Sequence, residues 1–187
     1  MAIPVKAGRI AGYPNLELTP EDAARLGTAL GTLIGDKSIV VVARDYYPPS
    51  RMLKRSFTSG LMSTGATVMD FHAATTPELV YAIKRFGAKA GVQFTISSFS
   101  ENNVTIKIFN HRGIEYSEKD IKKLVEIAEQ GNFRRATPSR IGWINYAEYI
   151  HEIYSAAATR IIDSDLVSET ALARFSIVLF IFSHPRF

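Results

Sequence analysis

The sequence predicts an α/β fold: a three-layer domain with a largely parallel sheet, one antiparallel edge strand and helices on both faces. Short apolar runs alternate with helix-length segments along most of the chain, and this alternation implies crossover connections between parallel strands. The run at residues 38–43 is an unbroken series of mostly β-branched residues, which is typical of a strand buried on both faces of a parallel sheet. One well-buried domain is expected, because 187 residues are few for two complete ones.

The first helix is predicted from Pro20 to about Ile34. Thr19 supplies a capping hydroxyl and Pro20 fits the first turn. Glu21 and Asp22 place negative charge at the positive end of the helix dipole.

Three buried strands and the two helices between them follow. The predicted bounds are 38–43, 67–71 and 90–96 for the strands, and 50–63 and 76–86 for the helices. We expect Ser50 to cap the first of these helices and Thr76-Pro77-Glu78 to open the second. Gly65 and Gly87 follow the predicted helix ends, where glycine is common.

The next segment, residues 104–109, is predicted to be the antiparallel edge strand. Thr105 and Lys107 lie on one side of it and apolar residues on the other, and a turn follows at His111-Arg112-Gly113. One polar face suits a half-exposed sheet edge.

The rest of the chain is expected to lead out of the domain. A charged amphipathic helix is predicted from Ser117 to about Gly131, and residues 133–142 have the composition of a linker. A long helix over about 145–162 follows, and 174–180 has the composition of another buried strand. We therefore divide the chain into a domain over residues 1–142 and a segment over 143–187 that holds an exit helix and the truncated start of a second domain.

Composition argues against several classes of protein. The 22 lysines and arginines are interspersed with 18 acidic residues, so a nucleic-acid partner is not expected. The chain has no cysteine, which rules out disulfides and fits a cytoplasmic protein. The longest apolar run, residues 175–182, is too short to span a bilayer. The four histidines are far apart in the sequence and show no metal-ligand spacing.

The order and wording of several segments resemble one known family. They are similar to the first domain of the α-D-phosphohexomutases, the phosphoglucomutases and phosphomannomutases, over about Gly8 to Asp163. The segments that carry the resemblance are 18–31, 40–54, 60–68, 75–79 and 146–163.

This resemblance implies intramolecular phosphoryl transfer on hexose phosphates. The family motif Thr-Ala-Ser-His-Asn-Pro, which carries a phosphoserine after the third strand, reads Thr95–Ser100 here. It implies that Ser97 is the catalytic nucleophile and, once phosphorylated, a metal ligand, and that Lys107 takes the place of the family's catalytic lysine. Arg44 and Ser98 are implied as substrate-binding residues. Mg²⁺ is implied as the cofactor, although we do not expect the isolated chain to bind it.

The same motifs also depart from the family pattern. Ser98–Ser100 replace His-Asn-Pro, Ala11 replaces an arginine that faces the phosphoserine, and Tyr46 and Tyr47 replace Thr-Arg. Each lost donor or cation removes stabilisation of the transition state. The family's metal, sugar and phosphate loops lie in later domains. We therefore expect the isolated chain to be an incomplete enzyme, inactive alone, and the sequence does not tell which sugar phosphate is the substrate.

Plainer interpretations of the same residues stay open. Ser97 is also explained as a serine that closes a strand by bonding to its own loop, and Lys107 as an edge lysine that discourages strand pairing. Arg44 and Asp45 are expected to pair and shape the turn after the first strand. The tyrosine-rich stripe over residues 146–157 is interpreted as packing.

Three functional hypotheses follow. The chain is an enzyme fragment that needs the missing mutase domains, or a non-catalytic module that forms homo-oligomers through its apolar tail, Phe175–Phe187. The third hypothesis is a module that binds a hexose phosphate without turnover, through Arg44 and Lys107.

Overall fold

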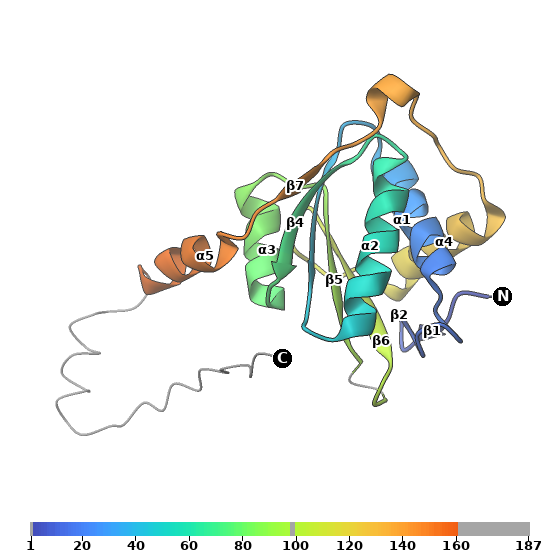
Figure 1. Cartoon of the computed structure of the whole chain (residues 1–187), viewed down its shortest axis with the longest axis horizontal. Helices are drawn as coiled ribbons and strands as arrows, with labels where there is room; N and C mark the ends of the chain where they lie inside the picture. The colour runs from blue at the N-terminus through green and yellow to red at the C-terminus, as the bar shows by residue number, and fades with distance from the viewer. Residues whose placement is uncertain (1, 98–99, 161–187) are drawn as a thin grey trace. The chain divides into compact units, whose positions relative to one another are not determined.

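The computed structural model describes residues 2–97 and 100–160 and confirms the α/β class. Within these residues, seven strands form one sheet in the order β1-β2-β6-β5-β3-β4-β7. Helices cover both faces of this sheet (Figure 1). The described residues up to His151 belong to one compact unit, and the described residues from Glu152 to Arg160 belong to a second. The division at 142/143 remains a prediction.

The parallel half of the sheet holds the strands that the apolar runs predict. β3 (Ile39–Arg44) lies between β4 (Thr67–Ala73) and β5 (Ala90–Ile96), and all three are parallel. Their carboxyl ends therefore meet at one edge of the sheet, the place where α/β sheets bind ligands.

The antiparallel edge is also confirmed, but it contains more strands than predicted. β6 (Val104–Asn110) pairs with β5 on one side and with β2 (Arg9–Gly12) on the other, and β1 (Val5–Lys6) lies outermost. The prediction that residues 104–109 are a half-exposed edge strand is therefore wrong. Ala11 of β2 pairs with Thr105 and leaves that threonine only 2% exposed.

Three helices cover one face of the sheet and one helix covers the other. The larger core packs α1 (Pro20–Ile34), α2 (Pro48–Met62) and α4 (Glu118–Gln130) against the sheet. α3 (Thr76–Arg85) contributes to a smaller core on the opposite face. The predicted cap at Thr19 is confirmed, because its hydroxyl accepts the N–H of Asp22 at 3.2 Å.

The start of α2 differs from the prediction. The helix begins at Pro48, with Tyr47 at the cap position, and Ser50 lies buried in the first turn. The fixed φ of proline suits the first helical positions, so Pro48 and Pro49 begin the helix before Ser50 is reached.

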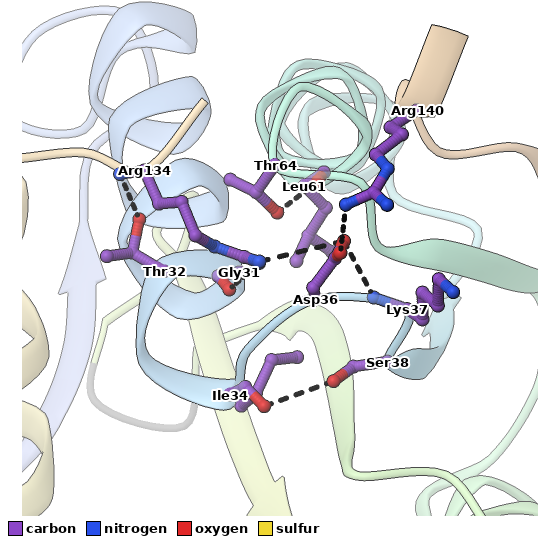
Figure 2. A network of polar contacts seen from close by, with 10 residues as sticks. All are labelled: Gly31, Thr32, Ile34, Asp36, Lys37, Ser38, Leu61, Thr64, Arg134 and Arg140. Carbon is purple, nitrogen blue, oxygen red and sulfur yellow. Dashed lines mark hydrogen bonds and ion pairs between the residues drawn. The ribbon is translucent and has the colours of Figure 1, made fainter. Parts of the chain in front are cut away.

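The chain after α4 crosses to the other edge of the sheet. A short 3₁₀ turn at Pro138–Arg140 interrupts this linker, as Figure 1 shows. In Figure 2, Asp36 lies between Arg134 and Arg140, each 3.6 Å from a carboxylate oxygen. The segment lacks long helices and strands, as expected, and it is held against the α1–β3 turn.

The predicted helix over 145–162 begins later than expected. Ile144–Tyr146 form β7, which pairs in parallel with β4, and α5 covers only Ile150–Thr159. The end of the predicted helix beyond residue 160 and the predicted strand at 174–180 lie outside the described residues. Across 2–97 and 100–160, no helix is both long and apolar enough to cross a bilayer.

Candidate active site

The turn after β3 is tied to the end of β5 by Asp45. Its backbone N–H donates to the carbonyl of Phe94 at 3.0 Å, and one carboxylate oxygen accepts the N–H of Ile96 at 2.5 Å. The other oxygen accepts the N–H of Tyr47 at 3.0 Å. Asp45 thus fixes the backbone directly before Ser97.

Ser97 follows the last residue of β5, at the carboxyl edge of the parallel strands. Its N–H donates to the carbonyl of Asn103 at 2.8 Å, which closes the loop that leads into β6. The hydroxyl of Tyr47 donates to the carbonyl of Asn102 at 3.1 Å and ties the same loop to the start of α2. Ser97 is 8% exposed. Ser98, the predicted substrate-binding neighbour, lies outside the described residues.

Arg44 ends β3 at this edge. Its Nη1 donates to the carbonyl oxygen of Asp45 at 2.7 Å, and the guanidinium lies 5.9 Å from the ring centroid of Tyr46. Arg44 and Asp45 therefore shape the turn as expected, but their contact uses the main chain of Asp45 and not an ion pair. The Nε of Arg44 is buried and has no hydrogen-bond partner among the described residues.

Lys107 lies elsewhere in the sheet. It is half-buried in β6 and pairs in register with Gln93, four residues before Ser97. At about 3.4 Å per residue, this separates Lys107 from Ser97 by roughly 14 Å along the strand. The structure does not bring the two predicted catalytic residues together, and a catalytic role for Lys107 remains a prediction.

A cleft of about 280 Å³ opens beside this turn, toward α3. Gln93 is 3% exposed and donates from Nε2 to the carbonyl of Ala74 at 3.0 Å, while its Oε1 is buried without a partner among the described residues. The cleft is lined by Arg44, Asp45, Tyr46, Thr75, Gln93 and Thr95, among others. A cation, hydroxyls and an unpaired amide oxygen are groups that can bind a polar ligand with hydroxyls.

His151 and Glu78 form a pair at the same cleft that the sequence analysis missed. His151 Nδ1 lies 2.6 Å from Glu78 Oε1, and Glu78 Oε2 accepts both the N–H and the hydroxyl of Thr75, at 2.7 and 2.8 Å. Burial opposes ionisation of Glu78, but the Thr75 N–H, the His151 ring and the Thr75 hydroxyl outweigh it and lower the pKa of Glu78. A carboxylate at the third helical position, three residues after a threonine, was a sequence signal for the Thr75 contacts. No sequence pattern pointed to His151 as the second partner of Glu78, because the two residues are 73 positions apart.

The described residues do not supply a magnesium site. Across 2–97 and 100–160, no three His, Cys, Asp or Glu side chains gather closely enough to hold a metal ion. The carboxylate of Asp45, which holds the residue before Ser97, already accepts two backbone N–H groups.

Sequence comparison identifies relatives among sugar-phosphate mutases. Residues 6–135 match the family described as phosphoglucomutase/phosphomannomutase, alpha/beta/alpha domain I. The chain is 37% identical to a probable phosphoglucosamine mutase of Thermococcus kodakarensis over 143 residues, which is 76% of this chain and 32% of that protein. It is 36% identical to a phosphopentomutase of the same organism, over 75% of this chain and 30% of the relative. The chain thus spans about a third of the length of these relatives.

Solved structures share the fold. A putative phosphomannomutase from Thermus thermophilus superposes with a TM-score of 0.71 at 21% identity, over 87% of this chain and 37% of that one. A phosphoglucomutase/phosphomannomutase family protein from Burkholderia thailandensis superposes with a TM-score of 0.65 at 23% identity, over 77% of this chain and 32% of that one. The match over residues 6–135, together with the shared fold, shows that the chain belongs to the phosphoglucomutase/phosphomannomutase family, as its domain I.

Proposed function

We propose that the chain acts as the phosphoryl-accepting domain of a hexose-phosphate mutase, with Ser97 as the acceptor. The observation that carries this proposal is the place of Ser97 directly after β5, at the carboxyl edge of the parallel strands. Asp45 supports the proposal because it holds the N–H of Ile96 and so fixes the loop start. Ligands of α/β sheets bind outside this edge.

The proposed reaction consists of two phosphoryl transfers. The Ser97 hydroxyl attacks the phosphorus of a hexose bisphosphate, the bond from phosphorus to the sugar oxygen breaks, and the serine proton replaces the phosphoryl group on that oxygen. A hexose monophosphate then accepts the group at its other end by the reverse step. Phosphoryl transfer depends chiefly on positioning and charge stabilisation, and Arg44 is the cation that β3 contributes at this edge.

The proposed substrates and partners extend beyond this chain. Because the chain spans 32% of a phosphoglucosamine mutase relative, the domains that recognise the sugar and its second phosphate are proposed as partners of domain I. Hexose phosphates are the proposed substrate class, and the relatives named as phosphoglucosamine mutase and phosphopentomutase are consistent with a sugar phosphate.

Phosphorylation of Ser97 tests the proposal directly. The chain is incubated with glucose 1,6-bisphosphate in a magnesium-containing buffer and its mass is measured, followed by peptide mapping of the modified residue. One added phosphoryl group on Ser97 is expected, and it should be absent in Ser97→Ala. Ser100→Ala is the matched control in the same loop, since Ser100 is exposed and its hydroxyl, among the described residues, donates to the neighbouring Glu101 carbonyl. An unmodified wild-type chain, or phosphate on another residue, contradicts the proposal.

Binding of a hexose phosphate without turnover is the second candidate. It is favoured by the unpaired Oε1 of Gln93 and the nearby Arg44 in the cleft beside the turn. Calorimetry with glucose 1-phosphate should then give binding heat in both wild type and Ser97→Ala, and the absence of heat in both contradicts it.

Homo-oligomerisation through Phe175–Phe187 remains a proposal from the sequence, because that segment lies outside the described residues. Light scattering on the eluted chain tests it. A dimeric or larger mass supports the proposal and a monomeric mass contradicts it.

A further inference from the structure

A second cleft lies on the other face of the parallel strands, between α2 and the edge formed by β4 and β7. We call it the α2–β7 cleft. Its volume is about 460 Å³. Arg44 of β3 and Arg51, Lys54 and Arg55 of α2 bring four cationic side chains to its lining.

Two of these four cations are not balanced by acids of the cleft. Lys54 forms a buried ion pair with Asp70, and His72 Nε2 lies 3.4 Å from the carboxylate of Glu148. The lining holds four cationic side chains and two carboxylates, those of Asp70 and Glu148. Counting His72 as uncharged, the formal charge of the lining is therefore +2. Arg51 and Arg55 are exposed, and neither forms an ion pair within the described part of the chain.

The cations also influence one another. Burial lowers the pKa of Lys54, the Asp70 carboxylate opposes that shift, and the charges of Arg44 and Arg55 add to the lowering. Lys54, Arg44 and Arg55 are therefore close enough for their charges to act together on an anion in the cleft.

An unsatisfied buried hydroxyl lies in the same cleft. Thr58 is 6% exposed, and its Oγ1 has no hydrogen-bond partner among the residues described. The threonines of α1 differ, because Thr28 and Thr32 donate to the carbonyls four residues earlier, at 2.9 and 2.8 Å. A buried donor without an acceptor costs free energy, so Thr58 and the unpaired Nε of Arg44 both favour a ligand rich in acceptor oxygens.

We propose that the α2–β7 cleft is a binding site for a small molecule that carries a phosphate group, held by Arg51, Arg55 and the hydroxyl of Thr58. A phosphate dianion matches the excess of two charges, whereas a single carboxylate balances only one. Guanidinium groups bind phosphate oxygens in paired hydrogen bonds, and an unprotonated phosphate oxygen can accept the hydroxyl proton of Thr58. The site lies on the α2 face, involves neither Ser97 nor its loop, and does not depend on the proposed phosphoryl transfer.

The test is a titration of the full chain with inorganic phosphate at constant ionic strength, followed by amide chemical shifts in NMR spectra. Shift changes are expected in the first half of α2, at Asp70–His72 and at residues 144–148. The double variant R51Q/R55Q is expected to raise the Kd by about tenfold, because two charge-assisted contacts are lost. Thr58→Val, which keeps the side-chain shape, is expected to raise the Kd by about threefold to tenfold.

The matched control is K119Q/K123Q on α4. Lys119 and Lys123 are exposed and have the same four-residue spacing as Arg51 and Arg55, so the variant removes the same formal charge. The Kd of this variant for phosphate should stay within about twofold of the wild-type value, since the variant changes only the long-range attraction of the anion. Equal Kd values for the two double variants overturn the proposal, as do phosphate shifts confined to the Ser97 loop or spread evenly over surface lysines. Phosphorylation of Ser97 is measured separately, by mass, so failure of either proposal leaves the other testable.

Discussion

At the scale of single residues, the buried pair of Lys54 and Asp70 is the most consequential contact. Both side chains are almost fully buried, and Asp70 also accepts the N–H of His72 at 2.8 Å. Removal of one partner leaves the other charge buried and uncompensated, which costs far more than the loss of an exposed ion pair.

Lys54→Met is therefore expected to lower the free energy of unfolding by about 3–5 kcal/mol. The double variant K54M/D70N should lose less than K54M alone, since the asparagine is uncharged and still accepts the N–H of His72. Urea unfolding of the two variants and wild type provides the comparison. A loss below about 1 kcal/mol for K54M, the range of exposed pairs, would show that the lysine is not buried in an ion pair.

Glu78 gives the domain a specific dependence on pH. Its pKa is lowered in the folded state from an ordinary value of 4.5, because the contacts with Thr75 and His151 outweigh burial. A carboxyl group with a lowered folded pKa stabilises the protein above its unfolded pKa, and that contribution disappears as the pH falls through the folded value.

The thermal midpoint of the wild type should therefore fall between about pH 5 and pH 3 more steeply than that of Glu78→Gln. Glu101→Gln, at an exposed loop position, serves as the control and should follow the wild type. If the thermal midpoints of wild type and E78Q fall equally with pH, Glu78 is not the source of the pH dependence.

Sequence reasoning recovered the residues whose signals are local and missed those whose partners are distant. Ser97 and Asp45 were predicted to follow buried strands, and they do, although the role of Ser97 remains a prediction. Lys54 was missed although it lies among apolar positions of a helix, and Asp70 although it interrupts an apolar strand. The available signal was a charged residue in an otherwise apolar pattern, Lys54 in a helix and Asp70 in a strand. Only the fold shows that these two side chains form an ion pair.

At the scale of elements, bounds were predicted well wherever caps and apolar runs coincide. α1 and β5 have the predicted ends. β1 and β2 were not predicted because they have only two and four residues, and β2 forms by pairing with β6 while β1 forms by pairing with β2. β7 was mistaken for helix because its three residues are specified by pairing with β4 rather than by their own periodicity.

The contact between α1 and α2 depends on glycine at the point of closest approach. A Cβ atom on Gly60 would lie 2.0 Å from the carbonyl oxygen of Ala24, and one on Gly27 would lie 2.0 Å from that of Phe57. These neighbours are backbone atoms, so the helices themselves would have to separate.

Gly60→Ala is expected to destabilise the domain by about 3 kcal/mol, despite the higher helix propensity of alanine. Ser59→Ala, at the exposed neighbouring position of the same helix, should change stability by less than about 0.5 kcal/mol. Denaturant midpoints of the two variants decide the matter, and a neutral or stabilising G60A would mean that the helices are not this close.

At the scale of the whole domain, one crossing segment connects the two ends of the sheet. After α4 the chain passes the ends of α1 and α2 and then forms β7, which pairs with β4 as the last strand of the sheet. Backbone bonds fasten it, from Ala136 N to Ser63 O and from Gly142 N to Met62 O, both at 2.9 Å. The ion pairs of Asp36 add exposed charges to this attachment (Figure 2).

The backbone contacts should matter more than the ion pairs. Exposed pairs contribute about 0–1 kcal/mol, so Asp36→Asn is expected to change stability by no more than that. A Cβ on Gly142 would lie 1.8 Å from the carbonyl oxygen of Ala66. Gly142→Ala should therefore push the end of the linker off the sheet, at a cost of about 2–3 kcal/mol.

Amide hydrogen exchange distinguishes this local effect from general loosening. The N–H groups of Val68 and Ala147, which bond to Trp143 and Asp70 at 2.8 and 2.9 Å, report on the attachment of β7. In G142A both N–H groups should exchange faster than in wild type. The acceleration should be larger for them than for the N–H groups that bond β3 to β5. D36N should leave all of these exchange rates nearly unchanged. Uniform acceleration across the sheet in G142A would instead mean that β7 and the parallel core open as one cooperative unit.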